Sequence, residues 1–495
     1  MDKELTNVTK QSGIIFIGKI IGLTFGLLFN FVAARFLGAE VYGQFIFIFS
    51  FIGFFPLLVL LGLQQGLVYF IPKFNENEEK DKRNSIITFS FLLVLFFSCA
   101  ISILILMKSD FIAKTILNKP ELNNLIKLLS PLIIFTALNQ LSKGVFQGIK
   151  RINYFVFSQD LLIPVIKLTV LLITVLIGYE IYSLALASYI GTIIGTVYLV
   201  TVIYKEGLFS RIRFRKPSQY KELIKFSLPL LLTGYLGLIS NKTDIIMIGY
   251  FHSEDQVGIY NIALRIGTLS SFILVAFNTM FAPTISSLYS KRDMDTLANM
   301  YKVITKWIVG VNLIAFGLIL IFSEEIMRVF GSEFIVGSTT LILITIGQVM
   351  NAGVGSAGYI LIMTGNSLYA LYINFMAVII NITLNFLLIP IYGIEGAAFA
   401  SLISVFVINI LRLLLVYKLH KIHPYDVSYF ILLKTFIISF VIVYLLNNWI
   451  SLIWISQLIG LSITFIILFC LIYYYFGLTK QDNIILNAVL KKIKK

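Results

Sequence analysis

The sequence predicts an all-α polytopic membrane protein with about fourteen transmembrane helices. Of its 495 residues, 58% are hydrophobic and only 13% are charged, with a mean hydropathy of +0.93. A soluble core does not need so apolar a chain. Apolar runs long enough to cross about 30 Å of hydrocarbon recur along the chain from residue 12 to residue 476. Because lipid offers no partner to backbone polar groups, these runs are expected to be helices rather than open strands.

The expected spans follow one another with short connections. They are 12–36, 42–72, 85–107, 121–143, 154–178, 181–204, 222–250, 256–289, 301–322, 333–363, 368–391, 395–418, 427–449 and 451–476. Several exceed the roughly 20 residues that a crossing needs, so tilt or extension beyond the bilayer is expected. The polar start "MDKELTNVTK" precedes a full-length span without a small-residue cleavage site, so we expect it to be retained.

The distribution of basic residues predicts the orientation in the cell (cytoplasmic) membrane. Most lysines and arginines fall in the termini and in the loops on the N-terminal side. An even number of spans puts both termini on the same side of the membrane. The positive-inside rule predicts that this side is the cytoplasm. The densest basic stretch is "RIRFRKPSQYKE" (211–222). It is flanked by spans and has no folded domain to present it, so we expect contact with anionic membrane lipids and not with nucleic acid.

The two halves of the chain repeat each other. "FLGAEVYGQF" (36–45) aligns without a gap with "FHSEDQVGIY" (251–260) at an offset of 215 residues, and 179–205 aligns with 392–418 at an offset of 213. These registers predict two six-helix lobes related by a parallel repeat, with a cavity between them, plus two C-terminal helices. The predicted domains are an N-terminal lobe (1–210), a basic cytoplasmic linker (211–221), a C-terminal lobe (222–420), helices 13 and 14 (427–476) and a basic cytoplasmic tail (477–495).

Candidate ligand-binding residues are four of the cations that lie inside the predicted spans. These are Lys19, Lys167, Lys242 and Arg265. Placing one such group in the bilayer costs about 2.5–3.5 kcal/mol on insertion scales. Four of them are therefore expected to have a function or compensating partners, and we predict that they bind an anionic substrate.

Lys19 lies in "GKIIGLTFGLLFN" (18–30), a segment with a glycine at every fourth position. Gly18, Gly22 and Gly26 form a stripe of small residues on which another helix can pack closely, and Lys19 lies on the adjacent face. The alternative to ligand binding is structural, with the stripe packing helices and the lysine snorkelling to the inner surface.

Lys167 lies near the middle of span 154–178 and is expected near mid-bilayer. Asp160 precedes it by two helical turns on the same face, with Pro164 between them. A kinked helix that carries both charges suits a gate, and Asp160 is expected to act in ion coupling or charge pairing. The alternative is an internal ion pair with neighbouring helices.

"SNKTDIIMIG" (240–249) places Lys242 and Asp244 inside otherwise apolar sequence. Lys242 lies roughly 7–8 Å beyond the middle of its span, which is deep for an idle surface charge. We expect Lys242 to face the cavity, and Asp244 either to hold Arg265 on the next span or to take part in ion coupling. The alternative is a structural lock between the two helices.

Amides in apolar surroundings give a weaker signal for a sugar path. They are Gln64, Gln65, Asn139, Gln140, Asn278, Asn312, Asn351, Asn374, Asn381 and Asn385. Hydrogen bonds between helices explain most of them equally well.

Enzymatic chemistry finds little support in the sequence. No GxxxxGK[ST] motif is present, and the His420 and His423 pair lacks the further ligands of a metal site, so no metal or cofactor is expected. A membrane glycosyltransferase or polymerase would need a large outer loop, whereas the longest one here is 107–121. We therefore predict that the protein is not an enzyme.

Two stretches carry a resemblance to a known family. They are "AARFLGAEVYGQF" (33–45) and "DIIMIGYFHSEDQVGIYNIALRIGTLSSFILVAFNTMFAPTISSLYSKRD" (244–293). With the duplicated arrangement, the chain resembles the polysaccharide-biosynthesis flippases of the multidrug/oligosaccharidyl-lipid/polysaccharide exporter superfamily. The resemblance implies translocation of a polyprenyl-(pyro)phosphate-linked oligosaccharide from the cytoplasmic to the outer leaflet by alternating access, for cell-surface polysaccharide or glycan assembly. Its expected partners are that oligosaccharide, membrane lipids and glycan polymerase or ligase machinery, and we expect a monomer.

Two other functions remain open on the sequence. A cation-coupled multidrug or organic-cation exporter of the same superfamily would prefer an acidic cavity, whereas the candidate residues here are mostly cationic. A membrane polymerase or scaffold without transport is the second alternative.

The repeat does not extend to the charged residues of the second lobe. At the 215-residue offset, Lys242 and Asp244 correspond to Leu27 and Phe29 in the first lobe. The two lobes are therefore not expected to bind charge symmetrically.

Overall fold

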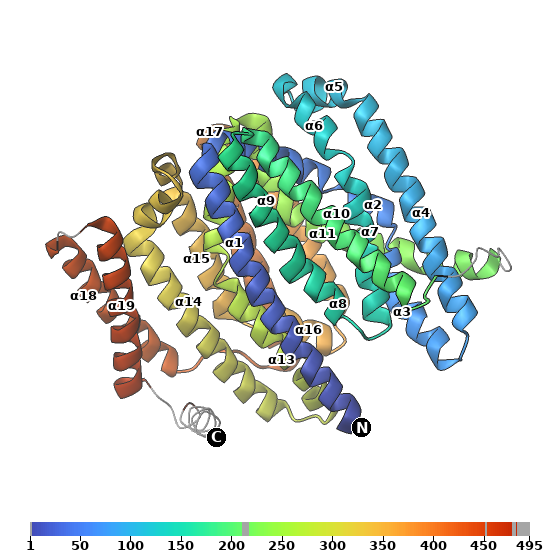
Figure 1. Ribbon diagram of the computed structural model, residues 1–495. Helices are drawn as coiled ribbons and strands as arrows, with labels where there is room; N and C mark the ends of the chain where they lie inside the picture. Colours follow the sequence, from blue (N-terminus) through green and yellow to red (C-terminus); the bar gives the residue numbers. More distant parts are fainter. Residues whose placement is uncertain (1, 210–216, 451–452, 478–481, 483–495) are drawn as a thin grey trace. The chain divides into compact units, whose positions relative to one another are not determined.

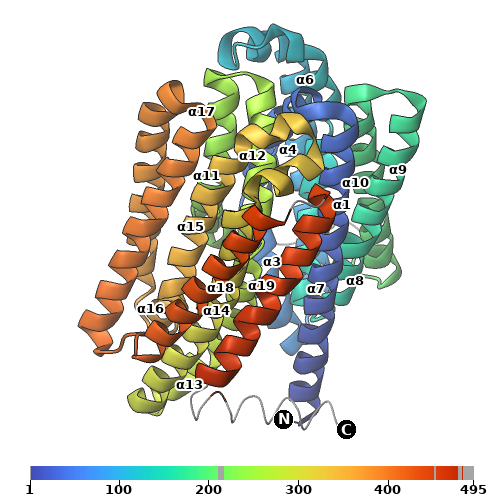
Figure 2. The same cartoon turned by 90° about the vertical axis from the view of Figure 1, so that its left-hand side faces the viewer.

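The computed structural model describes residues 2–209, 217–450, 453–477 and 482. These residues form helices joined by turns, with no strand among them, which confirms the predicted all-α fold (Figure 1 and Figure 2). The chain forms two compact units, Met1–Gly258 and Ile259–Lys495. Residues 211–216 of the predicted linker lie outside the described residues. The predicted tail, 477–495, also lies outside them except for Gly477 and Asp482.

The first unit contains helices α1 to α11 and the start of α12. Their bounds are α1 (Asp2–Ile52), α2 (Phe55–Leu60), α3 (Leu63–Glu76), α4 (Lys80–Met107), α5 (Ser109–Phe111), η1 (Ile112–Ile116), η2 (Pro120–Leu122), α6 (Asn123–Leu129), α7 (Leu132–Gly148), α8 (Asn153–Val156), η3 (Phe157–Leu162), α9 (Ile163–Ile177), α10 (Glu180–Lys205), α11 (Pro217–Phe251) and α12 (Glu254–Gly267). The second unit continues with α13 (Ser271–Ser290), α14 (Met294–Phe330), η4 (Ser332–Gly337), α15 (Ser338–Val354), α16 (Ala357–Met363), α17 (Ser367–His420), α18 (Ser428–Trp449) and α19 (Trp454–Phe476).

Among the described residues, eleven helical stretches are long and apolar enough to cross a membrane. The number is twelve if the bent pair Pro120–Leu129 and Leu132–Gly148 forms one span. The predicted count of fourteen is therefore approximate. Two stretches, Ile17–Glu76 and Ser367–His420, contain 60 and 54 residues, and each covers two of the predicted spans. Because one crossing needs about 20 residues, each of them has length for two crossings.

Both long stretches contain a glycine at the predicted turn. Gly38 interrupts α1 with a φ of 80°, and Gly393 interrupts α17 with a φ of 56°. Glycine adopts such backbone angles without the steric penalty of a side chain, so the chain can leave the helical path there. A different break divides the predicted span 256–289 into α12 and α13. There the Thr268 and Ser271 hydroxyls donate to carbonyls of the preceding turn, at 2.6 Å each, which competes with regular helical bonding.

Helix α7 lies at the centre of the first unit. It packs against α3, α4 and α10, while α1 packs against α9 and α10 (Figure 1). The approach of α7 to α3 depends on Gly144, where a Cβ atom would lie 2.5 Å from the carbonyl oxygen of Gln64. This close crossing brings the polar face of α7 next to Gln64.

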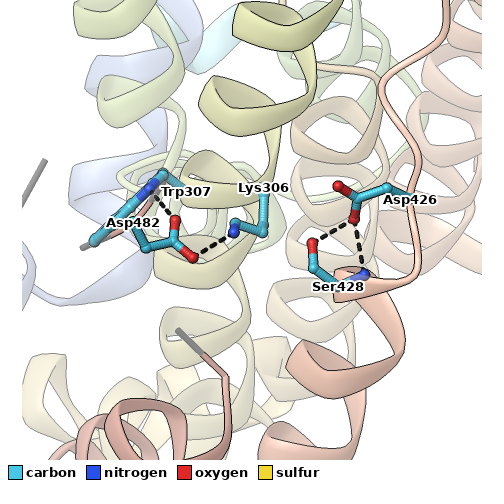
Figure 3. Close-up of polar contacts among 5 residues, drawn as sticks. All are labelled: Lys306, Trp307, Asp426, Ser428 and Asp482. Carbon is cyan, nitrogen blue, oxygen red and sulfur yellow. Dashed lines mark hydrogen bonds and ion pairs between the residues drawn. The ribbon is translucent and has the colours of Figure 1, made fainter. Parts of the chain in front are cut away.

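In the second unit, α15 packs against α14 and α17, and α18 and α19 pack against α14. Figure 3 shows that Asp482 is also fixed to α14. Its carboxylate lies 2.6 Å from Lys306 Nζ and accepts a hydrogen bond of 3.1 Å from Trp307 Nε1. In the same view, Asp426 accepts a 2.8 Å hydrogen bond from the backbone N–H of Ser428 at the start of α18. The Lys306 and Asp482 side chains are 4% and 0% exposed, so removing either partner would leave a buried charge, at a cost of about 3–5 kcal/mol.

Gly43 of α1 makes a very close contact with the start of α12. A Cβ atom on Gly43 would lie 1.7 Å from the carbonyl oxygen of Glu254 and 2.9 Å from the backbone nitrogen of Gly258. Gly43 and Gly258 are the two glycines that the predicted repeat equates. Lys119 adds an ion pair to Glu254 at 2.9 Å and donates to the carbonyl of His252 at 3.1 Å. The segment 252–258 is thus held on both sides.

This contact predicts a stability difference between two glycines of one helix. Gly43→Ala forces α1 away from Glu254, and overpacking of this kind costs about 1–3 kcal/mol. We expect the thermal unfolding temperature of the purified protein in detergent to fall by several degrees. Gly26→Ala is the matched control, because nothing lies within 4 Å of the Cβ position there, and its unfolding temperature should stay the same or rise slightly. Equal unfolding temperatures of the two variants would contradict the contact.

Candidate functional site

The first unit contains a cavity of about 1180 Å³. Its walls come from α1, α3, α7, α8, η3, α9 and α10. Four lysines and one carboxylate carry the charge in this lining, so positive charge is in excess. These residues are Lys19, Lys143, Lys150, Lys167 and Asp160.

One face of α7 supplies much of the polar wall. Thr136, Asn139, Lys143 and Gln147 follow one another at intervals of three or four residues, which places them on one side of the helix. Lys150 continues the row just after α7 ends, in a left-handed backbone conformation with a φ of 59°. At 1.5 Å per residue the row extends over about 20 Å. The cavity therefore has length for a ligand with several polar groups.

Lys167 reaches the cavity from α9. Its side-chain stem packs against Gly191 of α10, where a Cβ atom would lie 2.7 Å from Lys167 Cγ. Its ammonium group lies 5.7 Å from the centre of the Phe49 ring, a cation–π distance. A similar contact holds Lys143, whose Nζ lies 5.7 Å from the ring of Phe155. Aromatic side chains thus fix two of the cavity lysines.

Asp160 lies in η3, a short π-helical segment between α8 and α9. Pro164 lacks the N–H that would otherwise bond to the Asp160 carbonyl, which favours an irregular turn here. Such π-helical turns are frequent at functional sites. The aspartate packs against α1 at Gly22, where a Cβ atom would lie 3.2 Å from Asp160 Cβ. Its carboxylate also approaches Gly18, where a Cβ atom would lie 3.5 Å from Asp160 Oδ2.

Three of the six predicted charged residues line the cavity together: Lys19, Asp160 and Lys167. Two glycines of the α1 stripe pack against another element, because Gly18 and Gly22 contact Asp160, whereas Gly26 makes no such contact. Lys19 lines the cavity from the same helix. Lys242 of α11 is not among the lining residues, and its ammonium group donates to Ser50 Oγ at 3.3 Å.

The predicted pair of Asp244 and Arg265 is divided between the two units. Asp244 lies on α11 in the first unit and is 6% exposed. Arg265 lies on α12 in the second unit, with Nε 3.5 Å from Asn261 Oδ1 one helical turn away. The pairing of Asp244 with Arg265 stays a prediction.

Lys143 and Lys150 also line the cavity, although they are not among the candidates predicted from the sequence. Span 121–143 was predicted to end at Lys143, which places both lysines at a membrane edge, whereas α7 continues to Gly148. The signal that identifies them is the polar row with its spacing of three or four residues. Among the amides proposed for a sugar path, Gln64, Asn139 and Gln140 line the cavity.

Comparison with known protein families identifies the chain. The model of the family described as "Polysaccharide biosynthesis protein" matches residues 8–289, which is more than half of the sequence. The chain belongs to this family. A second family model, MatE, matches residues 229–387. The predicted flippase family of the exporter superfamily is therefore confirmed.

Relatives of this polysaccharide biosynthesis protein include one from Haloferax volcanii described as "Probable low-salt glycan biosynthesis flippase Agl15". It is 30% identical over 206 residues, which cover 39% of this chain and 42% of the relative. The chain thus aligns with less than half of that relative's length.

Two solved structures have the same fold. The lipid II flippase MurJ, in an inward closed conformation, superposes with a TM-score of 0.75 over 94% of this chain and 98% of its own, at 17% identity. An inward-facing multidrug resistance MATE transporter gives a TM-score of 0.68 over 81% of this chain and 94% of its own, at 16% identity. The fold, a multi-span helical membrane protein, is confirmed.

The excess of positive charge in the cavity predicts selective thiol labelling. In a chain whose Cys99 and Cys470 are replaced by serine, Gln147→Cys is labelled with an anionic sulfonatoethyl methanethiosulfonate and with its cationic trimethylammonium analogue. The ratio of the anionic to the cationic rate should be about tenfold higher than the same ratio for a small free thiol in water. The matched control adds Lys143→Gln and Lys150→Gln to the same chain, and its ratio should return to that of the free thiol. A ratio equal to that of the free thiol before the lysines are removed would contradict a cationic cavity.

Proposed function

We propose that the protein is a flippase that moves a polyprenyl-(pyro)phosphate-linked oligosaccharide from the cytoplasmic to the outer leaflet for glycan assembly. The observation that carries this proposal is the cavity with four lysines, one aspartate and several amides inside a helical membrane unit. Membership of the polysaccharide biosynthesis family and the description of the Haloferax relative as a probable flippase support it. The proposed role is transport without catalysis.

The chemistry of the cavity matches the difficulty that such a substrate poses. Its phosphate is anionic and its sugars are polar, so hydrocarbon excludes both, whereas its polyprenyl tail is soluble in lipid. Lysine ammonium groups neutralise phosphate and donate charge-assisted hydrogen bonds to it. Amides such as Gln64 and Asn139 can donate to and accept from sugar hydroxyls. A cavity of this composition would lower the free-energy barrier to moving the head group across the membrane.

The predicted orientation would put the lysine-rich end of the cavity toward the cytoplasmic face. With the N-terminus in the cytoplasm, the C-terminal end of α7, with Lys143 and Lys150, lies near that face, while Lys167 lies near mid-bilayer. The substrate would therefore enter from the leaflet where lipid-linked sugars are assembled. Alternating access also requires an outer closure, and we assign it to the contact of Lys119 and Glu254 with the neighbouring Gly43.

An organic-cation exporter is the alternative within the superfamily. The MatE match and the MATE neighbour agree with the shared fold, and fold alone does not decide the substrate. A cationic drug would need carboxylates in its site, whereas the cavity lining has one carboxylate against four lysines. The charge balance therefore favours an anionic substrate.

Deletion of the gene in its native host distinguishes these functions. The flippase proposal predicts that a glycosylated polyprenol accumulates in the inner leaflet and that the wild-type copy relieves the accumulation. Unchanged glycolipids together with an altered tolerance to cationic drugs would instead favour the exporter.

The cavity lysines should be more important for transport than lysines elsewhere. A variant carrying both Lys143→Gln and Lys167→Gln loses two charge-assisted contacts, so glycolipid flipping in proteoliposomes should fall at least about tenfold. Lys114→Gln is the matched control, because Lys114 is 59% exposed and pairs with Asp110 away from the cavity. Its flipping rate should change less than about twofold. A similar loss in both variants would argue against the proposed site.

The outer closure predicts a charge-swap result. Lys119→Glu and Glu254→Lys should each lower flipping, because each puts two like charges at a contact of 2.9 Å. The double swap restores opposite charges and should recover much of the activity. If the double swap remains as impaired as either single variant in the same proteoliposome assay, this ion pair is not part of the closure.

A further inference from the structure

The cavity has two chemically different ends. The lysine end consists of Lys19, Lys143 and Lys150, at the C-terminal end of α7 and on the facing part of α1. The amide end consists of Gln64, Thr136, Asn139, Gln140 and Thr192, and Lys167 lies beside it because Gly191, next to Thr192, holds its stem. Along α7, Thr136, Asn139 and Gln140 line the cavity first, and Lys143, Gln147 and Lys150 follow. Positive charge therefore increases along the length of the cavity, although Gln147 and Gln159 add amides to the lysine end.

Asn139 carries an unsatisfied hydrogen-bond donor at the amide end. It lines the cavity and is 4% exposed, and its Nδ2 atom has no hydrogen-bond partner among the described residues. Almost all buried polar side-chain atoms in native proteins have a partner, whereas this donor is buried behind the cavity wall without one. Rotation of the Asn139 amide toward the cavity would bring the donor within reach of a ligand acceptor. A sugar hydroxyl or ring oxygen supplies such an acceptor.

The two ends differ in what they can bind. A lysine ammonium group donates hydrogen bonds and cannot accept them, which suits a phosphate, whose oxygens only accept when ionised. Amide and hydroxyl side chains both donate and accept, which suits sugar hydroxyls, since these also do both. The reverse placement would set amide oxygens against phosphate oxygens and leave sugar hydroxyl donors facing ammonium groups.

We propose that the cavity binds its substrate in one orientation, with the sugars at the amide end around Asn139 and the phosphate at the lysine end around Lys143 and Lys150. This inference rests on the proposed flippase function and adds a saccharide subsite to it. In the predicted membrane orientation, the phosphate stays near the cytoplasmic headgroup level while the sugars enter first. Asp160 packs against Gly18 and Gly22, the glycines on either side of Lys19, and therefore belongs to the lysine end.

A binding experiment with two probes tests this orientation. The full chain in lipid nanodiscs is titrated with farnesyl diphosphate and with farnesyl diphosphate that carries di-N-acetylchitobiose. Wild type should bind the glycosylated probe about tenfold more tightly, because the amide end adds hydrogen bonds only to that probe. Asn139→Leu should abolish this difference and leave the affinity for farnesyl diphosphate within about twofold. Lys143→Gln should weaken the binding of both probes by a similar factor.

The outcomes separate the subsite from the function on which it rests. The saccharide subsite is wrong if Asn139→Leu weakens the binding of both probes by the same factor, or if wild type binds both probes with the same affinity. Anion binding stands in either case. If wild type binds neither probe, the proposed function itself is overturned. Thr192→Val is a second amide-end variant, on α10 instead of α7, and should also reduce binding of the glycosylated probe alone. Size-exclusion profiles and unfolding temperatures check that each variant is folded.

Discussion

The cost of holding positive charge inside a membrane is the constraint on which the rest of the structure depends. Each lysine placed in hydrocarbon is unfavourable by a few kcal/mol, so the fold has to give its cavity lysines local support. The structure does this with close helix contacts and aromatic rings. Gly191 makes room for the stem of Lys167, and Phe49 and Phe155 lie under the ammonium groups of Lys167 and Lys143. The resulting cavity presents positive charge in an otherwise apolar helical unit.

Irregular helices shape the same site. The missing N–H of Pro164 favours the π-helical turn at Asp160, which places a carboxylate in the wall of the cavity. Small residues on α1, the helix that carries Lys19, let this turn pack closely against it. The irregular turn η3 and the glycine-lined helix α1 are therefore the same elements that carry Asp160 and Lys19.

The sequence predicted the helical membrane fold because hydropathy reports directly on the length and number of apolar runs. It predicted breaks between spans at 37–41 and 392–394, and the helices are interrupted there at Gly38 and Gly393. The grouping of Lys19, Asp160 and Lys167 in one cavity could not be derived, because hydropathy gives the depth of a residue and not the neighbours of its helix. Lys143 was missed for a related reason, since a polar helix face at a membrane edge resembles an ordinary helix end.

The central claim is that an anionic lipid head group is held by the lysines of the first unit. An electron cryo-microscopy map of the protein in nanodiscs with a polyprenyl diphosphate-linked oligosaccharide tests it most directly. The account predicts phosphate density within hydrogen-bonding distance of the ammonium groups of Lys143 or Lys150, inside the cavity. Phosphate density found only in the surrounding lipid, outside the cavity, with the cavity holding only solvent, would contradict it.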